Sequence, residues 1–210
     1  MIHVFYNSRA AISMKYQKYL DQLPAEFQNQ ILKYRNWEDA QRSLYGKLLL
    51  KSGLEYLQLN GYKLSDIKYS AHQRPYFDHT FDFNIAHSGE FVLCAISKTH
   101  KVGVDIEEVR ATELNDFHDY FNGQEWEKII NSNQHFHEFY KLWTQKEAII
   151  KASGEGLSIP LKEVLIKDNE AVVNNEKWHL IPLSLNQDYV SYLATDSDSS
   201  EVTVQQIEFD

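Results

Sequence analysis

Two acidic residues, two positions apart, are the first residues of this chain whose types and spacing could do chemistry. Asp105 and Glu107 lie in the segment 103–107, which reads Gly-Val-Asp-Ile-Glu. Side chains alternate faces along an extended segment, so both carboxylates point one way while Val104 and Ile106 point into a core. Two neighbouring carboxylates repel each other unless positive charge lies between them. A hard divalent cation such as Mg²⁺, which takes carboxylate, water and phosphate oxygens, would supply that charge.

A helix in the second half of the chain carries the next candidates. Glu147 and Lys151 are four residues apart, so they share one helix face. The helix is predicted from about residue 138 to Ser153, because two glycines and then a proline follow, as is typical of helix ends. Exposed pairs of this kind are common and contribute little stability, so an ordinary surface ion pair is the alternative. In the functional interpretation, Glu147 is a third metal ligand.

Length and composition are those of a folded protein with a substantial core. The 210 residues are 43% hydrophobic and 13% aromatic, enough for one large domain or two small ones. The single cysteine, Cys94, excludes an internal disulfide and fits a reducing compartment. No apolar run reaches membrane-spanning length, and residues 1–6 read as a strand rather than a signal peptide. We therefore expect a cytoplasmic protein that does not enter a membrane.

The net charge of −9 is unevenly distributed along the chain. Residues 1–102 carry 13 Lys and Arg against 9 Asp and Glu, a net of +4, whereas residues 103–210 carry 8 against 21, a net of −13. This balance argues against nucleic acid bound over the whole surface, because such binding relies on cationic side chains. The polar segment 98–101 separates the two parts, so we predict an N-terminal half over residues 1–102 and a C-terminal half over residues 103–210.

Periodicity predicts helices and strands in both halves. The predicted helices cover about 24–34, 37–57, 114–120, 124–131 and the helix that ends at Ser153, and the predicted strands cover 4–6, 67–70, 83–88, 91–96, 103–107, 164–166, 178–181, 189–195 and 202–207. The strand 91–96 is apolar throughout, so it is expected to be buried on both faces. The pattern of residues 189–195 is similar to that of residues 91–97, which is a faint sign of an internal repeat.

The two candidate motifs, taken together and in this order, resemble a known enzyme family. The segment 103–107 is followed about forty residues later by Trp-x-x-Lys-Glu-Ala-x-x-Lys-Ala-x-Gly-x-Gly-Leu at residues 143–157. This combination resembles the 4′-phosphopantetheinyl transferases, and most of all their surfactin-type class, a single chain of roughly this length. The resemblance implies an α+β fold made of a pseudo-twofold pair of similar α/β halves. Each half is a small, mainly antiparallel sheet packed with helices, and the site lies at the seam.

The resemblance also implies a reaction and its partners. Enzymes of this family transfer the 4′-phosphopantetheine arm of coenzyme A to a serine of an apo acyl carrier or peptidyl carrier protein. The reaction depends on Mg²⁺ and releases 3′,5′-ADP. We accordingly expect a monomer whose partners are coenzyme A and a carrier protein, with no role for nucleic acid or membrane. Whether the carrier serves fatty acid, polyketide, nonribosomal peptide or lysine biosynthesis stays open.

Several residues receive roles through this resemblance. Asp105, Glu107 and Glu147 would bind the metal, and Lys151 would act in catalysis and contact coenzyme A. The remaining positions that match the family are Arg42, Ser43, Arg74 and His87, as contacts of coenzyme A, and Glu125, as an acid beside the metal site. Without the resemblance these five are ordinary residues: a helix-surface pair, a solvated loop cation, a structural histidine and an acid at a helix start.

The expected mechanism follows from charge. A carrier serine attacks the β-phosphate of coenzyme A, so the barrier lies mainly in the charge of the pyrophosphate and the alignment of the nucleophile. Mg²⁺ on the three carboxylates would bind the pyrophosphate oxygens, and Lys151 would neutralise charge that develops on the leaving group. Either Glu147 or Glu125 could accept the serine proton, directly or through water, and the sequence leaves both open.

Two other functions are compatible with an acidic cluster, and three positions depart from the family pattern. One alternative is a non-catalytic nucleotide- or carrier-binding module with a structural Mg²⁺ or Ca²⁺, and the other is a Mg²⁺-dependent nucleotide hydrolase. Lys151 argues against the binding module, because a structural metal site has no need of a cation aimed at a leaving group. Ala86 stands where the family commonly has Ser, and Phe27 and Gln30 stand where close relatives have lysines. These changes predict weaker binding of coenzyme A and leave the reaction unaltered.

Overall fold

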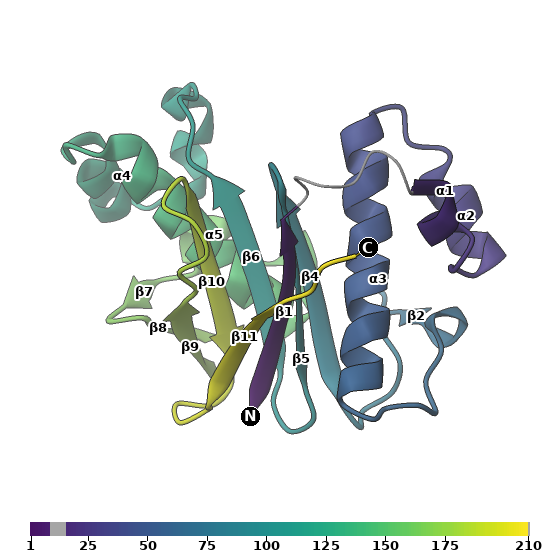
Figure 1. Cartoon of the computed structure of the whole chain (residues 1–210). Helices are drawn as coiled ribbons and strands as arrows, with labels where there is room; N and C mark the ends of the chain where they lie inside the picture. Colours follow the sequence, from purple (N-terminus) through teal and green to yellow (C-terminus); the bar gives the residue numbers. More distant parts are fainter. Residues whose placement is uncertain (9–15, 210) are drawn as a thin grey trace.

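Two sheets form the centre of the computed structural model, which describes residues 1–8 and 16–209 (Figure 1). The first sheet has the order β11-β1-β5-β4, and these strands span Val202–Gln206, Ile2–Ser8, Phe91–Ser97 and Asp82–Ser88. The second sheet has the order β6-β10-β9-β8-β7, with strands Val102–Glu108, Tyr189–Thr195, Glu176–Pro182, Glu170–Val173 and Ile166–Lys167. A short hairpin pairs β2 (Lys68–Tyr69) with β3 (Pro75–Tyr76). Apart from the parallel pair β1–β11, the pairings are antiparallel.

Each sheet packs against one long helix. Figure 1 shows α3 (Trp37–Tyr56) beside the first sheet and α5 (His135–Ser153) beside the second, on opposite sides of the molecule. The shorter helices are α1 (Tyr16–Leu20), α2 (Ala25–Ile31) and α4 (Gly123–Ile130), and 3₁₀ turns span Leu64–Asp66, Leu114–Tyr120, Gly156–Ser158 and Leu161–Glu163. No helix in the described part of the chain is both long and apolar enough to cross a membrane.

Alternating side chains on the strands build three apolar clusters. One cluster lies between α3 and the first sheet, and a second lies between α5 and the second sheet. The third joins the two sheets, and it contains Val4 and Leu93 from the first sheet with Val104 and Ile106 from the second. The two aliphatic residues of β6 therefore enter a core, as the alternation predicts, and the intervening residues of β6 face α5.

The seam between the sheets runs along β4 and β6 and is made by side chains of β4. They accept hydrogen bonds from backbone amides of β6 that lie 20 residues further along the chain: Val102 donates to Asp82 Oδ2 (2.8 Å), Val104 to Asn84 Oδ1 (2.9 Å) and Glu108 to Ser88 Oγ (3.1 Å). Polar side chains at alternate positions of β4 thus satisfy backbone groups of β6 that would otherwise be unpaired. These bonds fix the position of one half against the other.

Most sequence-based expectations about the fold are confirmed. The α+β architecture of two mainly antiparallel sheets with helices is observed, and β5 is buried along its whole length. The helix predicted over 24–34 ends at Ile31. The strand predicted over 164–166 is shifted, because β7 begins only at Ile166: Val164 follows a 3₁₀ turn, and its carbonyl accepts a hydrogen bond from a buried lysine. The division at residue 102 stays a prediction, and β11 from the C-terminal half pairs with β1 from the N-terminal half.

Substituting Gly103 with Ala is expected to destabilise the fold. A Cβ atom at this position of β6 would overlap the backbone of α5 at Ala148 and Ala152. Because backbone cannot rotate away as a side chain can, we expect the free energy of unfolding to fall by about 3 kcal/mol or more. Denaturant unfolding would measure this change. The matched control is Gly123→Ala at the exposed start of α4, where a Cβ meets nothing within 4 Å, and an equal loss there would contradict the packing argument.

Candidate active site

A lysine and a buried carboxylate form the centre of the candidate site. Lys151, near the end of α5, places Nζ 2.6 Å from Oδ1 of Asp105 on β6. Asp105 is only 4% exposed. Burial by itself would lower the pKa of Lys151, but the carboxylates of Asp105, Glu147 and Glu107 outweigh that effect and raise it. The Lys151 ammonium is therefore stabilised by three acidic side chains, whose assignment to a metal stays a prediction.

The other two carboxylates lie close to this ion pair. Glu107 Oε2 accepts a hydrogen bond from Ser88 Oγ on β4 at 2.9 Å. Burial, and next the charge of Asp105, raises the pKa of Glu107 to about 7. Burial also raises the pKa of Glu147, which Lys151 opposes. The side chains of β6 and α5 thus gather negative charge in a partly dehydrated site, where it is unfavourable without a cation.

The donor atoms suit a hard divalent cation. Asp105 Oδ2 is buried and has no hydrogen-bond partner among the residues that the structure describes. A buried carboxylate oxygen without a partner is costly unless a cation or water satisfies it. The carboxylates are arranged around the Lys151 ammonium, and no group of three or more His, Cys, Asp or Glu side chains within residues 1–8 and 16–209 is gathered as a metal cage. The match to Mg²⁺ lies in the chemistry of the oxygens and not in a preformed cage.

Glu125 lies outside this cluster and is occupied by other partners. Its Oε2 accepts a hydrogen bond from the Asn122 amide (3.0 Å), which completes the capping box of α4. Its Oε1 lies 2.9 Å from Nζ of Lys146, whose side chain is fully buried. Lys146 also donates to the carbonyls of Leu161 (3.0 Å) and Val164 (2.7 Å). This ion pair ties α5 to α4 and to the segment after α5.

Lys146 had no role in the sequence interpretation, although it stands in the same motif as Glu147 and Lys151. Burial lowers the pKa of Lys146, and its bond to Glu125 opposes that shift. The only signal for it in the sequence is its place next to Glu147. Lysines are normally exposed, so nothing local predicts that this one fills a core position with three oxygen partners.

Arg42, Ser43 and His87 lie on the N-terminal half. Arg42 on α3 donates to the Gly89 carbonyl (3.2 Å) and forms an ion pair with Asp39 (2.6 Å), which links α3 to the turn after β4. Ser43 is half-buried on the same helix. His87, near the end of β4, is exposed at its edge. Partial desolvation and then the charge of Arg42, with a smaller effect of Lys151, lower its pKa. The structure therefore brings His87 and Arg42 into one electrostatic environment that reaches Lys151.

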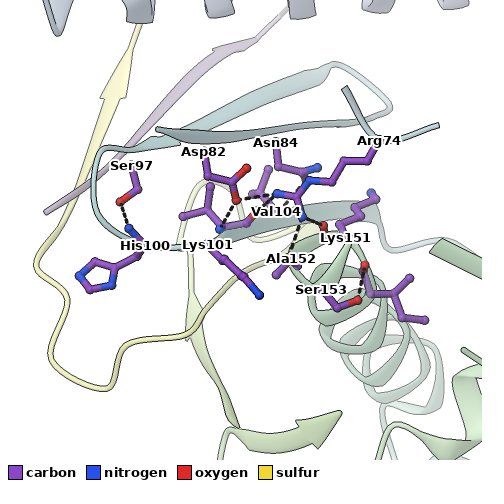
Figure 2. Close-up of polar contacts among 12 residues, drawn as sticks. Arg74, Asp82, Asn84, Ser97, His100, Lys101, Val104, Lys151, Ala152 and Ser153 are labelled. Atoms are coloured by element: carbon purple, nitrogen blue, oxygen red, sulfur yellow. Dashed lines mark hydrogen bonds and ion pairs between the residues drawn. The ribbon is translucent and has the colours of Figure 1, made fainter. Parts of the chain in front are cut away.

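Arg74 lies against the C-terminal end of α5, where it contacts the last turn of the helix. Figure 2 shows its guanidinium between Asp82 and the last turn of that helix. It donates to the carbonyls of Lys151 and Ala152, both at 2.6 Å, and to Asp82 Oδ2, also at 2.6 Å. A further bond goes to the Val102 carbonyl (2.9 Å). Protein atoms thus engage the side chain that the resemblance assigns to coenzyme A.

A pocket of about 230 Å³ opens between the two halves beside these residues. Residues 72–75 and Asn84 line it from the N-terminal half, and α5 contributes Glu147 and Lys151. Glu125 does not line this pocket. The arrangement offers a cation, three carboxylate groups around it and a cleft of small-molecule scale where two structural units meet, which is a common location for ligand sites.

Comparison with known proteins identifies relatives over most of the chain. Residues 101–201 match a model described as the 4′-phosphopantetheinyl transferase superfamily, and residues 10–99 match one described as 4′-phosphopantetheinyl transferase, N-terminal. The chain is 36% identical to the 4′-phosphopantetheinyl transferase gsp of Aneurinibacillus migulanus over 69% of its own length and 62% of that protein. It is 30% identical to the 4′-phosphopantetheinyl transferase ffp of Bacillus subtilis over 80% of its own length and 77% of that protein. The solved structure of Thermotoga maritima holo-[acyl-carrier-protein] synthase (AcpS) is 19% identical, with a TM-score of 0.38, over 45% of this chain and 61% of its own.

Proposed function

Because the chain belongs to the 4′-phosphopantetheinyl transferase family, in its single-chain, surfactin-type class, we propose that it transfers the 4′-phosphopantetheine arm of coenzyme A to a serine of an apo carrier protein. The observation that carries this proposal is the Lys151–Asp105 ion pair beside a pocket at the seam, with Glu107 and Glu147 around it. Transfer of a phosphorus-containing group requires positive charge and fixed donors of this kind.

Coenzyme A would lie across the seam between the two halves. Arg42, Ser43 and His87 on the N-terminal half would contact the nucleotide, and Lys151 would approach the pyrophosphate from α5. The family pattern assigns Arg74 to this ligand as well, although its guanidinium already donates four hydrogen bonds within the protein. A cleft lined from both halves supports a ligand that bridges them.

The reaction replaces the phosphoanhydride linkage of the pyrophosphate by a phosphoester linkage to serine. The hydroxyl oxygen of the carrier serine forms a bond to the β-phosphorus, and the bond from this phosphorus to the oxygen of the α-phosphate breaks. The departing 3′,5′-ADP keeps that oxygen and its electron pair, so negative charge grows on it. Lys151 would stabilise this charge, because its ammonium is held by Asp105 and needs no reorganisation during the step.

Magnesium fits the same site. Asp105, Glu107 and Glu147 would hold it, and when bound it would supply the positive charge that the pyrophosphate oxygens require. The unpartnered oxygen of Asp105 supports this assignment. Ser88 would orient Glu107 through its hydrogen bond, as outer residues commonly orient metal ligands.

The serine proton has two candidate acceptors, and the geometry favours Glu147. A general base must come within hydrogen-bond reach of the proton, directly or through one water. Glu147 lines the pocket, whereas both oxygens of Glu125 are engaged by Asn122 and Lys146. We therefore assign the proton to Glu147 or to a water bound there, and we assign Glu125 to holding α4 against α5.

Substituting Glu125 with Gln is expected to affect stability more than turnover. Gln keeps the shape and an acceptor oxygen but removes the counter-ion of the buried Lys146, so we expect a loss of about 1–3 kcal/mol in the free energy of unfolding. The kcat should change by less than about tenfold, because a lost general base typically lowers it by about 10²–10⁴-fold. Urea unfolding and steady-state kinetics would measure the two effects. Glu127→Gln, an exposed site on the same helix, is the control, and a kcat loss in the general-base range would restore Glu125 as the base.

One assay separates the transferase from the two alternatives. The protein is mixed with coenzyme A, Mg²⁺ and an apo carrier protein, and the carrier is then weighed by mass spectrometry. A gain of one phosphopantetheine arm identifies the transferase. Free 3′,5′-ADP with an unmodified carrier identifies the hydrolase, and ligand binding without any product identifies the binding module. Acyl carrier and peptidyl carrier proteins, tested in parallel, distinguish the two substrate classes.

A further inference from the structure

Arg74 and Asp82 form a closed set of hydrogen bonds that joins three elements. Arg74 Nη2 donates to Asp82 Oδ2 on β4 and to the Val102 carbonyl on β6, and the Val102 amide donates to the same Asp82 oxygen. Both backbone groups of Val102 are thereby satisfied by one ion pair. A charge-assisted pair of this kind, whose side chains are only 15% and 24% exposed, is much better fixed than a surface ion pair.

The other guanidinium nitrogen binds the end of the helix that carries Lys151. The last carbonyls of a helix have no partner within it, and the negative end of the helix dipole attracts a cation. Arg74 Nη1 takes two of these carbonyls, those of Lys151 and Ala152. The helix is capped by Gly154, which has a left-handed backbone (φ 78°). A Cβ atom at Gly154 would lie 3.4 Å from the Arg74 side chain, so the glycine leaves room for it.

Lys151 is consequently held at both ends. Its carbonyl accepts from Arg74 of the N-terminal half, and its ammonium binds Asp105 of β6. The loop that carries Arg74 is itself closed, because the Arg74 amide donates to Ser70 Oγ (3.1 Å) and the Ser70 amide donates to the Arg74 carbonyl (2.9 Å). The position of the Lys151 backbone is thus set from the opposite half of the molecule.

We propose that Arg74, together with Asp82, is a positioning residue that fixes Lys151 for phosphopantetheine transfer, and that it does not bind the phosphates of coenzyme A. The proposal rests on the proposed function for its kinetic consequence. A phosphate at Arg74 would have to displace hydrogen bonds that satisfy helix carbonyls and Asp82. A lysine here would not make the same contacts, because a single ammonium lacks the planar fork that reaches four acceptors at once.

Three variants test the proposal: Arg74→Lys, Asp82→Asn and the double variant. Asp82 does not line the pocket that Glu147 and Lys151 line, although it lines a second pocket together with Arg74 and Ala152. We expect both single variants to lower kcat by about ten- to a hundredfold, because Lys151 would then be misplaced relative to the reacting phosphate. The KM for coenzyme A should change less than about threefold. The double variant should be little worse than either single one, because the two residues act as one unit.

A second ligand distinguishes positioning from phosphate binding. Each variant is assayed with coenzyme A and with 3′-dephospho-coenzyme A, and the ratio of the two kcat/KM values is compared with that of the wild type. Positioning leaves this ratio unchanged, because both ligands lose the same alignment. A rise in KM confined to coenzyme A in Arg74→Lys, with a normal Asp82→Asn variant, would overturn the proposal. Asp188→Asn, an exposed acid outside the seam, is the control and should behave as the wild type does.

Measurements without substrate keep the outcome independent of the proposed function. We expect Arg74→Lys and Asp82→Asn to speed amide hydrogen exchange selectively at the end of α5, and their effects on the melting temperature to be clearly less than additive. Unchanged exchange there, or fully additive effects, would refute the positioning role even in an active enzyme. A wild type that modifies no carrier, yet shows this coupling, would count against the proposed transferase and leave the structural link standing.

Discussion

Replacing Lys151 with Ala is expected to lower kcat for phosphopantetheine transfer by about a hundred- to a thousandfold, with a smaller rise in the KM for coenzyme A. This decrease in kcat is the one expected when an enzyme loses one preorganised group at the point where charge develops in the transition state. Lys151 suits that role because three carboxylates keep it charged and Asp105 fixes its ammonium at 2.6 Å. An interaction that strengthens only as the leaving group departs acts on kcat rather than on binding.

The measurement is a steady-state assay in which coenzyme A is varied at a saturating concentration of apo carrier. Lys141→Ala is the matched control, because it removes a lysine from the same helix at a half-exposed position away from the carboxylates. Circular dichroism and thermal unfolding would establish that the Lys151 variant is folded at the assay temperature. If KM alone rises, Lys151 holds the ground-state phosphate and takes no special part in the transition state.

Replacing Asp105 with Asn is expected to lower Mg²⁺-dependent turnover by at least about a hundredfold. Asn keeps the size of the side chain but removes the charge from both roles of Asp105, as the partner of Lys151 and as the oxygen donor with an unpaired, buried Oδ2. Its neutral oxygen is a weaker ligand for a hard divalent cation. We also expect the affinity for Mg²⁺ to fall by at least about tenfold, because mutating a residue that only orients a metal ligand already lowers metal affinity by about ten- to a hundredfold.

Calorimetric titration of Mg²⁺, in the presence and absence of 3′,5′-ADP, measures the metal affinity separately from activity. Wild-type protein stripped with a chelator should lose turnover and regain it when Mg²⁺ is added, and the Asp105 variant should regain little. Glu108→Gln, which neutralises the next acid of β6 on the opposite face, is the control. Normal turnover in the Asp105 variant would remove this residue from the metal site and leave it as the anchor of Lys151.

The Glu125 and Arg74 variants test whether two residues that the family pattern places near the ligand act on the ligand or hold the site in place. Both side chains bind protein atoms at every terminal oxygen or nitrogen that carries their charge. We expect large losses of activity in the Lys151 and Asp105 variants, a loss of stability in the Glu125 variant and a selective loss of kcat in the Arg74 variant. This result would distinguish the residues that take part in the reaction from those that hold them in place. The candidate site would then consist of a small reactive centre and two ion pairs that hold its helix in place.

Local sequence was enough to predict most of the elements and to propose part of the site. The alternation in β6 places Val104 and Ile106 in a core and leaves Asp105 for the other face, because the two-residue period of a strand is a local property. The spacing of Glu147 and Lys151 on one helix, and the glycine that ends it, are likewise local. The order of the two motifs was enough to suggest the family, since each motif carries its residues at fixed separations.

Tertiary structure alone decided which partners these side chains have. Lys146 meets carbonyls that lie 15 and 18 residues away, and Arg74 meets the end of α5 at a separation of 77. A buried lysine and an exposed one look alike in a sequence, because burial depends on what packs around them. The pairing of β11 with β1, and the side chains of β4 that satisfy β6, depend equally on contacts between distant segments. Residue types and spacing therefore predicted which side chains could react. Long-range hydrogen bonds determined which charged groups remain available to a ligand and which ones stabilise the fold.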